Sequence, residues 1–147
     1  MNWQKHPPRD ENFEQRIMQS FSDQGYMSFI GAELDLVAHG KVNINLPKNS
    51  NLNQQHGFFH GGVITSIADS AAGFAALTTF DADCGILTSE LKINFLNPAA
   101  GKYLVAKGRV IRPGKTITVC QADVFNDDNT HIATALLTMV RVENLKN

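Results

Sequence analysis

One acidic side chain stands alone in an apolar stretch of this 147-residue chain. Between residues 61 and 80 the only charged residue is Asp69, which follows Gly61 and Gly62 in the segment QQHGFFHGGVITSIADS. A carboxylate among alanines, isoleucines and phenylalanines is costly unless something pairs with it. In contact with a substrate, such a group can act as a nucleophile or a general base. The competing interpretation is a structural carboxylate that caps a loop or pairs with a buried arginine.

The two glycines ahead of Asp69 could supply the complementary part of a reactive site. A helix that begins near Gly61 exposes unpaired backbone N–H groups and the positive end of its dipole. These groups can bind the oxyanion that develops when a carbonyl is attacked, and Gly61 and Gly62 leave room for the carbonyl to approach. Asp69 lies more than two turns further along, too far to act on the same atom. A two-fold partner could bring another copy's carboxylate to this helix start.

The elements that must position these residues follow an α+β pattern with an antiparallel sheet. Residues 61–80 are too long for a strand and rich in alanine, which predicts a buried helix. The spacing of Phe13, Ile17 and Phe21 predicts a short amphipathic helix near the N-terminus. A sheet that buries most of the central helix must wrap around it, and its exposed edge strands favour pairing with a second copy. We expect two strands within residues 27–47, around a turn at His39-Gly40, and further strands within 90–99, 102–112, 115–125 and 130–142.

Composition narrows the class of protein. A net charge of −1, with 43% hydrophobic and 18% charged residues, is typical of a globular domain without nucleic-acid affinity, and we expect one domain over residues 1–147. Cys84 and Cys120 form no C-x-x-C pair, and the N-terminus carries no signal-peptide pattern, so we expect reduced thiols in a cytoplasmic protein. Residues 61–80 have the length of a membrane span, but the charge of Asp69 would be costly in the middle of a bilayer, which argues against one. We expect no metal, because His56 and His60 lack a third ligand.

The segments HGFFHGGVITSIADSAAG, LKINFLNPA and GRVIRPGKTITVCQADVF resemble the hotdog-fold acyl-CoA thioesterases, specifically the PaaI-like branch of the 4HBT superfamily. The resemblance extends from about Gln54 to the C-terminus. It implies a hotdog fold, in which an antiparallel sheet wraps around a long central helix. It also implies a homodimer or dimer of dimers with composite active sites, and hydrolysis of an aromatic or medium-chain acyl-CoA without a further cofactor.

The resemblance also implies roles for individual residues. Gln54 and the Gly61 N–H would polarise the thioester carbonyl, and Asp69 of the opposing subunit would act as nucleophile or general base. A hydroxyl on the strand after the helix would orient the water or the carboxylate. Thr88 is the best match for that hydroxyl, with Ser89 as the alternative. Some relatives carry a second hydroxyl one turn after the acid, where this chain has Gly73.

Further candidates are expected to bind the substrate rather than to react. His60 more plausibly fixes the loop through a ring-to-backbone bond than transfers a proton, and cations beside the coenzyme A phosphates are favourable. A non-catalytic acyl-CoA-binding or sensing hotdog domain is the main alternative function, and a hydratase or dehydratase is another. The expected substrate-binding residues are His60, Gly62, Phe58, Phe59, Ser89, Arg112 and Lys115.

Overall fold

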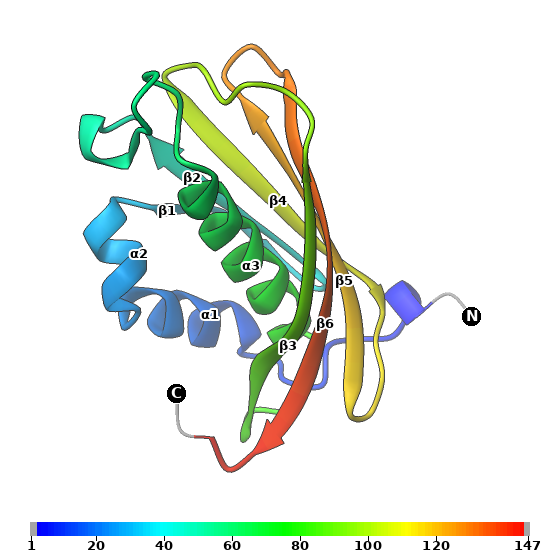
Figure 1. Ribbon diagram of the computed structural model, residues 1–147. Helices are drawn as coiled ribbons and strands as arrows, with labels where there is room; N and C mark the ends of the chain where they lie inside the picture. The colour runs from blue at the N-terminus through cyan, green and yellow to red at the C-terminus, as the bar shows by residue number, and fades with distance from the viewer. Residues whose placement is uncertain (1–2, 146–147) are drawn as a thin grey trace.

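The computed structural model describes residues 3–145 of the chain (Figure 1). The sheet is preceded by a short 3-10 helix and two α-helices, and a second 3-10 helix leads to the long helix α3. The helical elements are η1 (Trp3–Lys5), α1 (Phe13–Ser22), α2 (Gly25–Ile30), η2 (Ser50–Leu52) and α3 (Gly61–Leu77). The strands are β1 (Glu33–Ala38), β2 (Lys41–Pro47), β3 (Cys84–Phe95), β4 (Tyr103–Arg112), β5 (Ile117–Asn126) and β6 (His131–Glu143).

The six strands form one antiparallel sheet in the order β1-β2-β4-β5-β6-β3. The long helix α3 lies across one face of this curved sheet, as Figure 1 shows, and contacts every strand from β2 to β6. This arrangement is the hotdog fold, and it confirms the predicted sheet around a central helix. The strands β1 and β3 form the two edges, so the strand that directly follows α3 has one unpaired side.

Small side chains let α3 lie directly on the sheet. Ala71 and Ala72 are fully buried, and Gly108 of β4 lies beneath them. A side chain at position 108 would collide with the backbone of Ala71, so this crossing requires glycine. The alanine-rich composition of the helix is therefore explained by close packing on the sheet.

The helix α1 is tied to the C-terminal end of α3. Its Phe13 and Ile17 are buried, as the predicted stripe required, and Arg16 is half-buried beside Asp10, with an Nε to Oδ2 distance of 3.1 Å. The Arg16 guanidinium donates to three carbonyl oxygens, one at the last residue of α3, where a helix leaves acceptors unpaired, and two in the segment that follows it. These acceptors are Leu77 at 2.8 Å, Phe80 at 3.1 Å and Asp81 at 2.7 Å.

The two strands predicted within residues 27–47, around the turn at His39-Gly40, are confirmed, but the start of that segment is not extended. Residues 25–30 form the helix α2 instead, and the strand β1 begins only at Glu33. Met27 and Ile30, three residues apart, are both buried on one side of this helix. Gly31 then adopts a left-handed conformation with a φ of 75°, which ends the helix. The spacing of Met27 and Ile30 ahead of Gly31 is the helical signal that the strand interpretation overlooked.

Candidate active site

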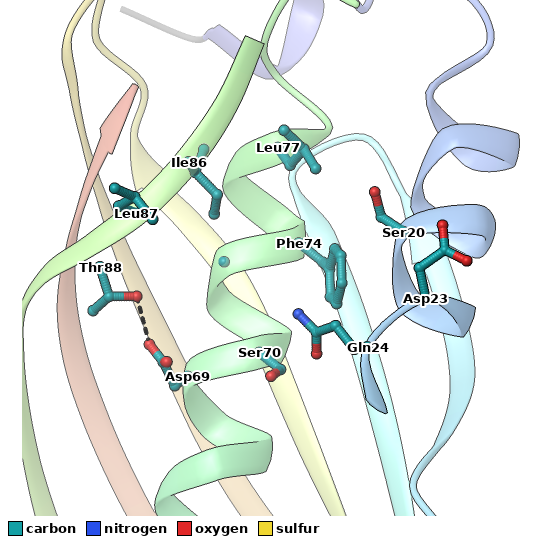
Figure 2. A pocket seen from close by; sticks show the side chains of 11 residues that line it. Ser20, Asp23, Gln24, Asp69, Ser70, Phe74, Leu77, Ile86, Leu87 and Thr88 are labelled. Carbon is teal, nitrogen blue, oxygen red and sulfur yellow. Dashed lines mark hydrogen bonds between the residues drawn. The ribbon is translucent and has the colours of Figure 1, made fainter. Parts of the chain in front are cut away.

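Within residues 3–145, the Asp69 carboxylate is held by one side chain, the Thr88 hydroxyl of β3. Thr88 Oγ1 donates to Asp69 Oδ1 across 2.8 Å, as Figure 2 shows. The hydroxyl also lies 3.4 Å from Met139 Sδ, but the carboxylate is the stronger acceptor. Burial raises the pKa of Asp69, and the bond from Thr88 acts in the opposite direction. No arginine in this described range pairs with Asp69, so its second oxygen remains available to water or substrate.

A β-bulge decides which hydroxyl of β3 reaches Asp69. Thr88 is paired with Met139 of β6 and Glu90 with Thr138, so Ser89 is the extra residue between them. A bulge of this kind redirects the side chains on either side of it. Thr88 consequently faces α3, whereas Ser89 Oγ donates to the Thr138 carbonyl at 3.1 Å.

Asp69 and Thr88 line a cavity of about 490 Å³ between α3, β3 and the end of α1. Its volume lies within the range of small-molecule sites in proteins. Figure 2 shows Phe74 of α3 and Ile86 of β3 on its apolar side, and Ser20 and Gln24 on the far side. The lining residues are Ser20, Asp23, Gln24, Asp69, Ser70, Gly73, Phe74, Leu77, Ile86, Leu87 and Thr88.

The start of α3 leaves one backbone donor free. His60 is the N-cap residue, and its Nδ1 accepts from the Gly62 N–H at 2.9 Å. The N–H groups of Val63 and Ile64 point to the His60 carbonyl oxygen, at 3.0 and 3.2 Å. Among the described residues nothing accepts from the Gly61 N–H, which stays available to a ligand. The His60 ring therefore caps the start of α3 and occupies the N–H of Gly62.

The Gln54 side chain belongs to a residue that lines the same cavity as Gly61. Its Oε1 accepts from the backbone N–H of His56, which leaves the Nε2 donors of the amide uncommitted. Gln54 and Gly61 line a second cavity of about 340 Å³, together with the half-buried Phe58 and the buried Phe59. The remaining lining residues are Ile64, Phe95, Asn97, Pro98 and Ala99.

The two cavities share no lining residue. Gly61 and Asp69 are eight residues apart on one helix, which at 1.5 Å per residue separates them by about 12 Å. Within one chain, the Gly61 and Gln54 donors and the Asp69 carboxylate therefore lie at two different places.

Five of the seven predicted substrate residues line neither cavity: His60 and Gly62 flank Gly61, Ser89 lies in the β3 bulge, and the other two are Arg112 and Lys115. Arg112 is exposed at the end of β4. Lys115 lies in the following turn and lines another cavity, near Trp3 and Thr79.

Residues 3–145 also contain no cluster of three His, Cys, Asp or Glu side chains that could hold a metal ion.

Sequence reasoning missed the far side of the Asp69 cavity. Ser20, Asp23 and Gln24 come from the end of α1 and the residues that follow it, more than forty positions before Asp69. Their polar side chains look like ordinary surface residues in the sequence, so no local pattern predicts that they meet α3.

The model of the thioesterase superfamily matches residues 56–133, more than half of the 147 residues. The chain belongs to the thioesterase superfamily. A related protein of Saccharolobus solfataricus, named "Putative esterase SSO1253", is 34% identical over 113 residues, which cover 77% of this chain and 75% of the relative. Other relatives of this thioesterase are named as acyl-CoA hydrolases or thioesterases.

Solved structures give the same result. A thioesterase family protein from Silicibacter pomeroyi matches with a TM-score of 0.85 and 36% identity, over 89% of this chain and 98% of that one. The PaaI protein of E. coli has the same fold, with a TM-score of 0.84 at 21% identity over 90% of this chain and 95% of its own. The chain is therefore a thioester hydrolase. No helix within residues 3–145 of this thioesterase has the length and apolarity needed to cross a bilayer.

Proposed function

We propose that this thioesterase hydrolyses acyl-CoA at composite sites between two copies of the chain. The observation that carries the proposal is the separation of its reactive groups. The carbonyl-binding donors Gly61 and Gln54 line one cavity, and Asp69 lines another about 12 Å away along the helix. A two-fold dimer contains two complete sites, because each copy gives its donors to one site and its carboxylate to the other.

At each site the thioester carbonyl oxygen accepts hydrogen bonds from the Gly61 N–H and Gln54 Nε2. These donors stabilise the oxyanion as the carbonyl carbon becomes tetrahedral. In the general-base route, Asp69 of the partner subunit takes a proton from water while the water oxygen attacks that carbon. Collapse of the intermediate breaks the C–S bond, and coenzyme A leaves as the thiolate, which takes up a proton.

In the nucleophilic route, a carboxylate oxygen of the partner subunit's Asp69 attacks the carbonyl carbon and expels the thiolate. The resulting anhydride is then cleaved by water to the free acid and the regenerated carboxylate. Both routes need an ionised carboxylate with one free oxygen, and the bond from Thr88 to Oδ1 supports that state. A single turnover in ¹⁸O-water separates the routes, since only hydrolysis of the anhydride can place ¹⁸O in the Asp69 carboxylate.

The edge strand β3 supports assembly of two copies. Its outer side lacks a partner strand, and Leu87 and Phe95 are 57% and 52% exposed. Unpaired edges with apolar side chains favour pairing with another chain. We propose a dimer, or a dimer of dimers, in which β3 extends the sheet into a second copy.

Cys84 and Cys120 are buried free thiols, which supports a reducing compartment such as the cytoplasm.

The cavity beside Asp69 is proposed to receive the acyl group. Phe74, Leu77 and Ile86 give it an apolar wall suited to an aromatic ring or a medium-length chain. The carboxylate and the acyl pocket of one copy would then serve the thioester held by the donors of the other.

The Asp69→Asn variant tests the proposal. General-base contributions are about 10²- to 10⁴-fold, so thiol release from a panel of acyl-CoAs should fall by that factor while the fold is retained. Asp128→Asn is the matched control, because Asp128 is exposed in a turn of the sheet and lines neither cavity. Hydrolysis by Asp69→Asn at the control's rate would refute the assignment.

A further inference from the structure

A third cavity, which we call the N-terminal cavity, lies at the other end of α3 from the Gly61 donors. Four segments far apart in the sequence enclose it, and they contribute among others Trp3, His39, Thr79 and Lys115 (Figure 1). Its volume is about 360 Å³, and pockets that bind small molecules begin at about 300 Å³. It shares no lining residue with the two cavities described above, so it is a separate place for a ligand.

The charged side chains that line the N-terminal cavity are all basic. Arg9 and Lys115 carry positive charges, and His6 adds an imidazole that can be protonated. Among the residues that the structure describes, no aspartate or glutamate lines this cavity. Arg9 Nη1 lies 3.6 Å from Asp81 Oδ2, but both side chains are about half exposed, and Asp81 also pairs with Arg141 at 3.3 Å. Exposed ion pairs of this kind are weak, so Arg9 can turn to an anion in the cavity.

The C-terminal end of α3 presents little free negative charge to this cavity. A helix normally ends in unpaired carbonyl oxygens, which carry the negative end of its dipole. The last three carbonyl oxygens of α3 each accept from a side chain: Ala75 from Thr78 Oγ1 at 2.7 Å, Ala76 from Thr79 Oγ1 at 2.7 Å and Leu77 from Arg16 Nη2 at 2.8 Å. The end of the helix is therefore compatible with an anion beside it.

One wall of the N-terminal cavity is aromatic. The indole of Trp3 lies so close over Gly40 that a side chain at this turn position would collide with it. His39 meets the indole edge-on, with ring centroids 5.6 Å apart. The turn itself is fixed by a bond from the Gly40 N–H to Thr78 Oγ1 at 2.7 Å. Trp3 remains half-buried, so part of a firmly placed aromatic ring is available to a planar ligand.

We propose that the N-terminal cavity binds a nucleotide, at a site separate from the catalytic groups. The phosphate oxygens accept from Arg9 and Lys115, because hydrogen bonds between cations and phosphates are strong, and the base packs against Trp3. Inorganic phosphate would use only the charges of the cavity, and a nucleoside would use only its aromatic wall. Lys115, predicted to meet the phosphates of coenzyme A, is thereby assigned to a different ligand.

The position of the cavity favours a free nucleotide over the nucleotide of coenzyme A. In the proposed function the acyl group fills the cavity that extends along α3 from Asp69 to Leu77. The coenzyme A part of the substrate must then leave the thioester in the other direction, away from the C-terminal end of that helix. Within one chain, Leu77 is sixteen residues beyond Gly61, about 24 Å along the helix. This step rests on the proposed function, whereas the binding of a nucleotide does not.

The test uses Trp3, which is the only tryptophan of the chain and lines the cavity. Titration of the full chain with AMP should change the tryptophan fluorescence to saturation, and calorimetric titration should give the same Kd. Adenosine and inorganic phosphate should each bind at least about tenfold more weakly, because each lacks one of the two contacts. The double variant Arg9→Gln/Lys115→Gln should likewise weaken AMP binding about tenfold or more.

Lys102→Gln/Arg109→Gln is the matched control, because it removes the same two charges from exposed positions that line none of the three cavities. It should bind AMP as the wild type does. Absence of AMP binding, equal affinity for adenosine or phosphate, or wild-type affinity in the Arg9→Gln/Lys115→Gln variant overturns the inference.

Steady-state hydrolysis in the presence of AMP tests whether the site is separate from the active site. We expect the KM for acyl-CoA in the wild type to be unaffected by occupation of the N-terminal cavity. A rise in KM with AMP that Arg9→Gln/Lys115→Gln abolishes would place the cavity in the coenzyme A site and would overturn the inference. Binding of AMP by a chain that hydrolyses no acyl-CoA would instead refute the proposed function alone.

Discussion

Mixing two inactive variants provides the strongest test of the composite site. Asp69→Asn removes the carboxylate and keeps the donors, whereas Gln54→Ala removes a donor and keeps the carboxylate. In a heterodimer of the two, one site combines Gln54 of the first variant with Asp69 of the second and is intact. The other site carries both defects and is inactive.

The expected magnitude follows from the symmetry. Losing the base reduces turnover by about 10²- to 10⁴-fold, and losing an oxyanion donor reduces it by about 10²- to 10³-fold, so each variant alone keeps about 1% activity or less. Random pairing of equal amounts gives about half heterodimers, each with one intact site of two, so the mixture should recover about a quarter of wild-type activity. Purified heterodimers should recover about half.

The assay is thiol release after the two variants, carrying different affinity tags, are unfolded and refolded together. Each variant refolded alone gives the baseline, and tandem purification on both tags isolates the heterodimer. If the donors and the carboxylate of one chain served the same site, every site in the mixture would carry a defect. Activity would then stay at the baseline of about 1%, and the separation of Asp69 from Gly61 would have no functional meaning.

Three further predictions concern single residues. Thr88→Val removes a hydrogen bond to a partly exposed carboxylate and should lower kcat about tenfold. In the wild type this bond lowers the pKa of Asp69, so its removal should raise that pKa. Because only the ionised carboxylate reacts, the acidic limb of the pH–kcat profile should then move to higher pH, and an unmoved limb would contradict the role of Thr88. His60→Ala should cost about 1 kcal/mol in unfolding free energy and reduce kcat, and His60→Asn, which can also cap a helix, should restore stability in thermal melts. Gly108→Ala should destabilise the fold by about 1–3 kcal/mol in urea titrations, whereas Gly25→Ala, with no atom near its added carbon, should have little effect.

The central helix could be predicted because its signals are local. An alanine-rich segment that starts at a pair of glycines predicts a buried helix from Gly61, and α3 begins there. The alternating apolar residues likewise predicted the strands after it; three of them differ in bounds by one or two residues, whereas β3 begins at Cys84, six residues before the predicted 90–99 segment. The spacing between Gly61 and Asp69 was sufficient to conclude that one helix cannot bring both to the same atom.

The features that depend on long-range packing could not be predicted. Whether Thr88 or Ser89 faces α3 depends on the bulge opposite Met139, and a slip of one residue in a strand reverses every side chain after it. The polar end of the pocket is equally invisible in the sequence, because Ser20 and Gln24 reach α3 only through the packing of α1. Local patterns specify elements, whereas the walls of a pocket come from segments that the fold brings together.

The proposed exchange of carboxylates between two copies also constrains how their helices meet. If Gly61 of each copy faces the partner's Asp69, the two α3 helices run in opposite directions and the two-fold axis passes near the midpoint, about residue 65. Close approach there requires side chains that are small and need no partner across the axis. Thr65 and Ser66 meet both conditions, because their hydroxyls donate at 2.8 Å to the Gly61 and Gly62 carbonyls of their own helix. In the proposed dimer, one stretch of α3 would therefore supply the Gly61 N–H, the Asp69 carboxylate and, between them, the small side chains that lie at the two-fold axis.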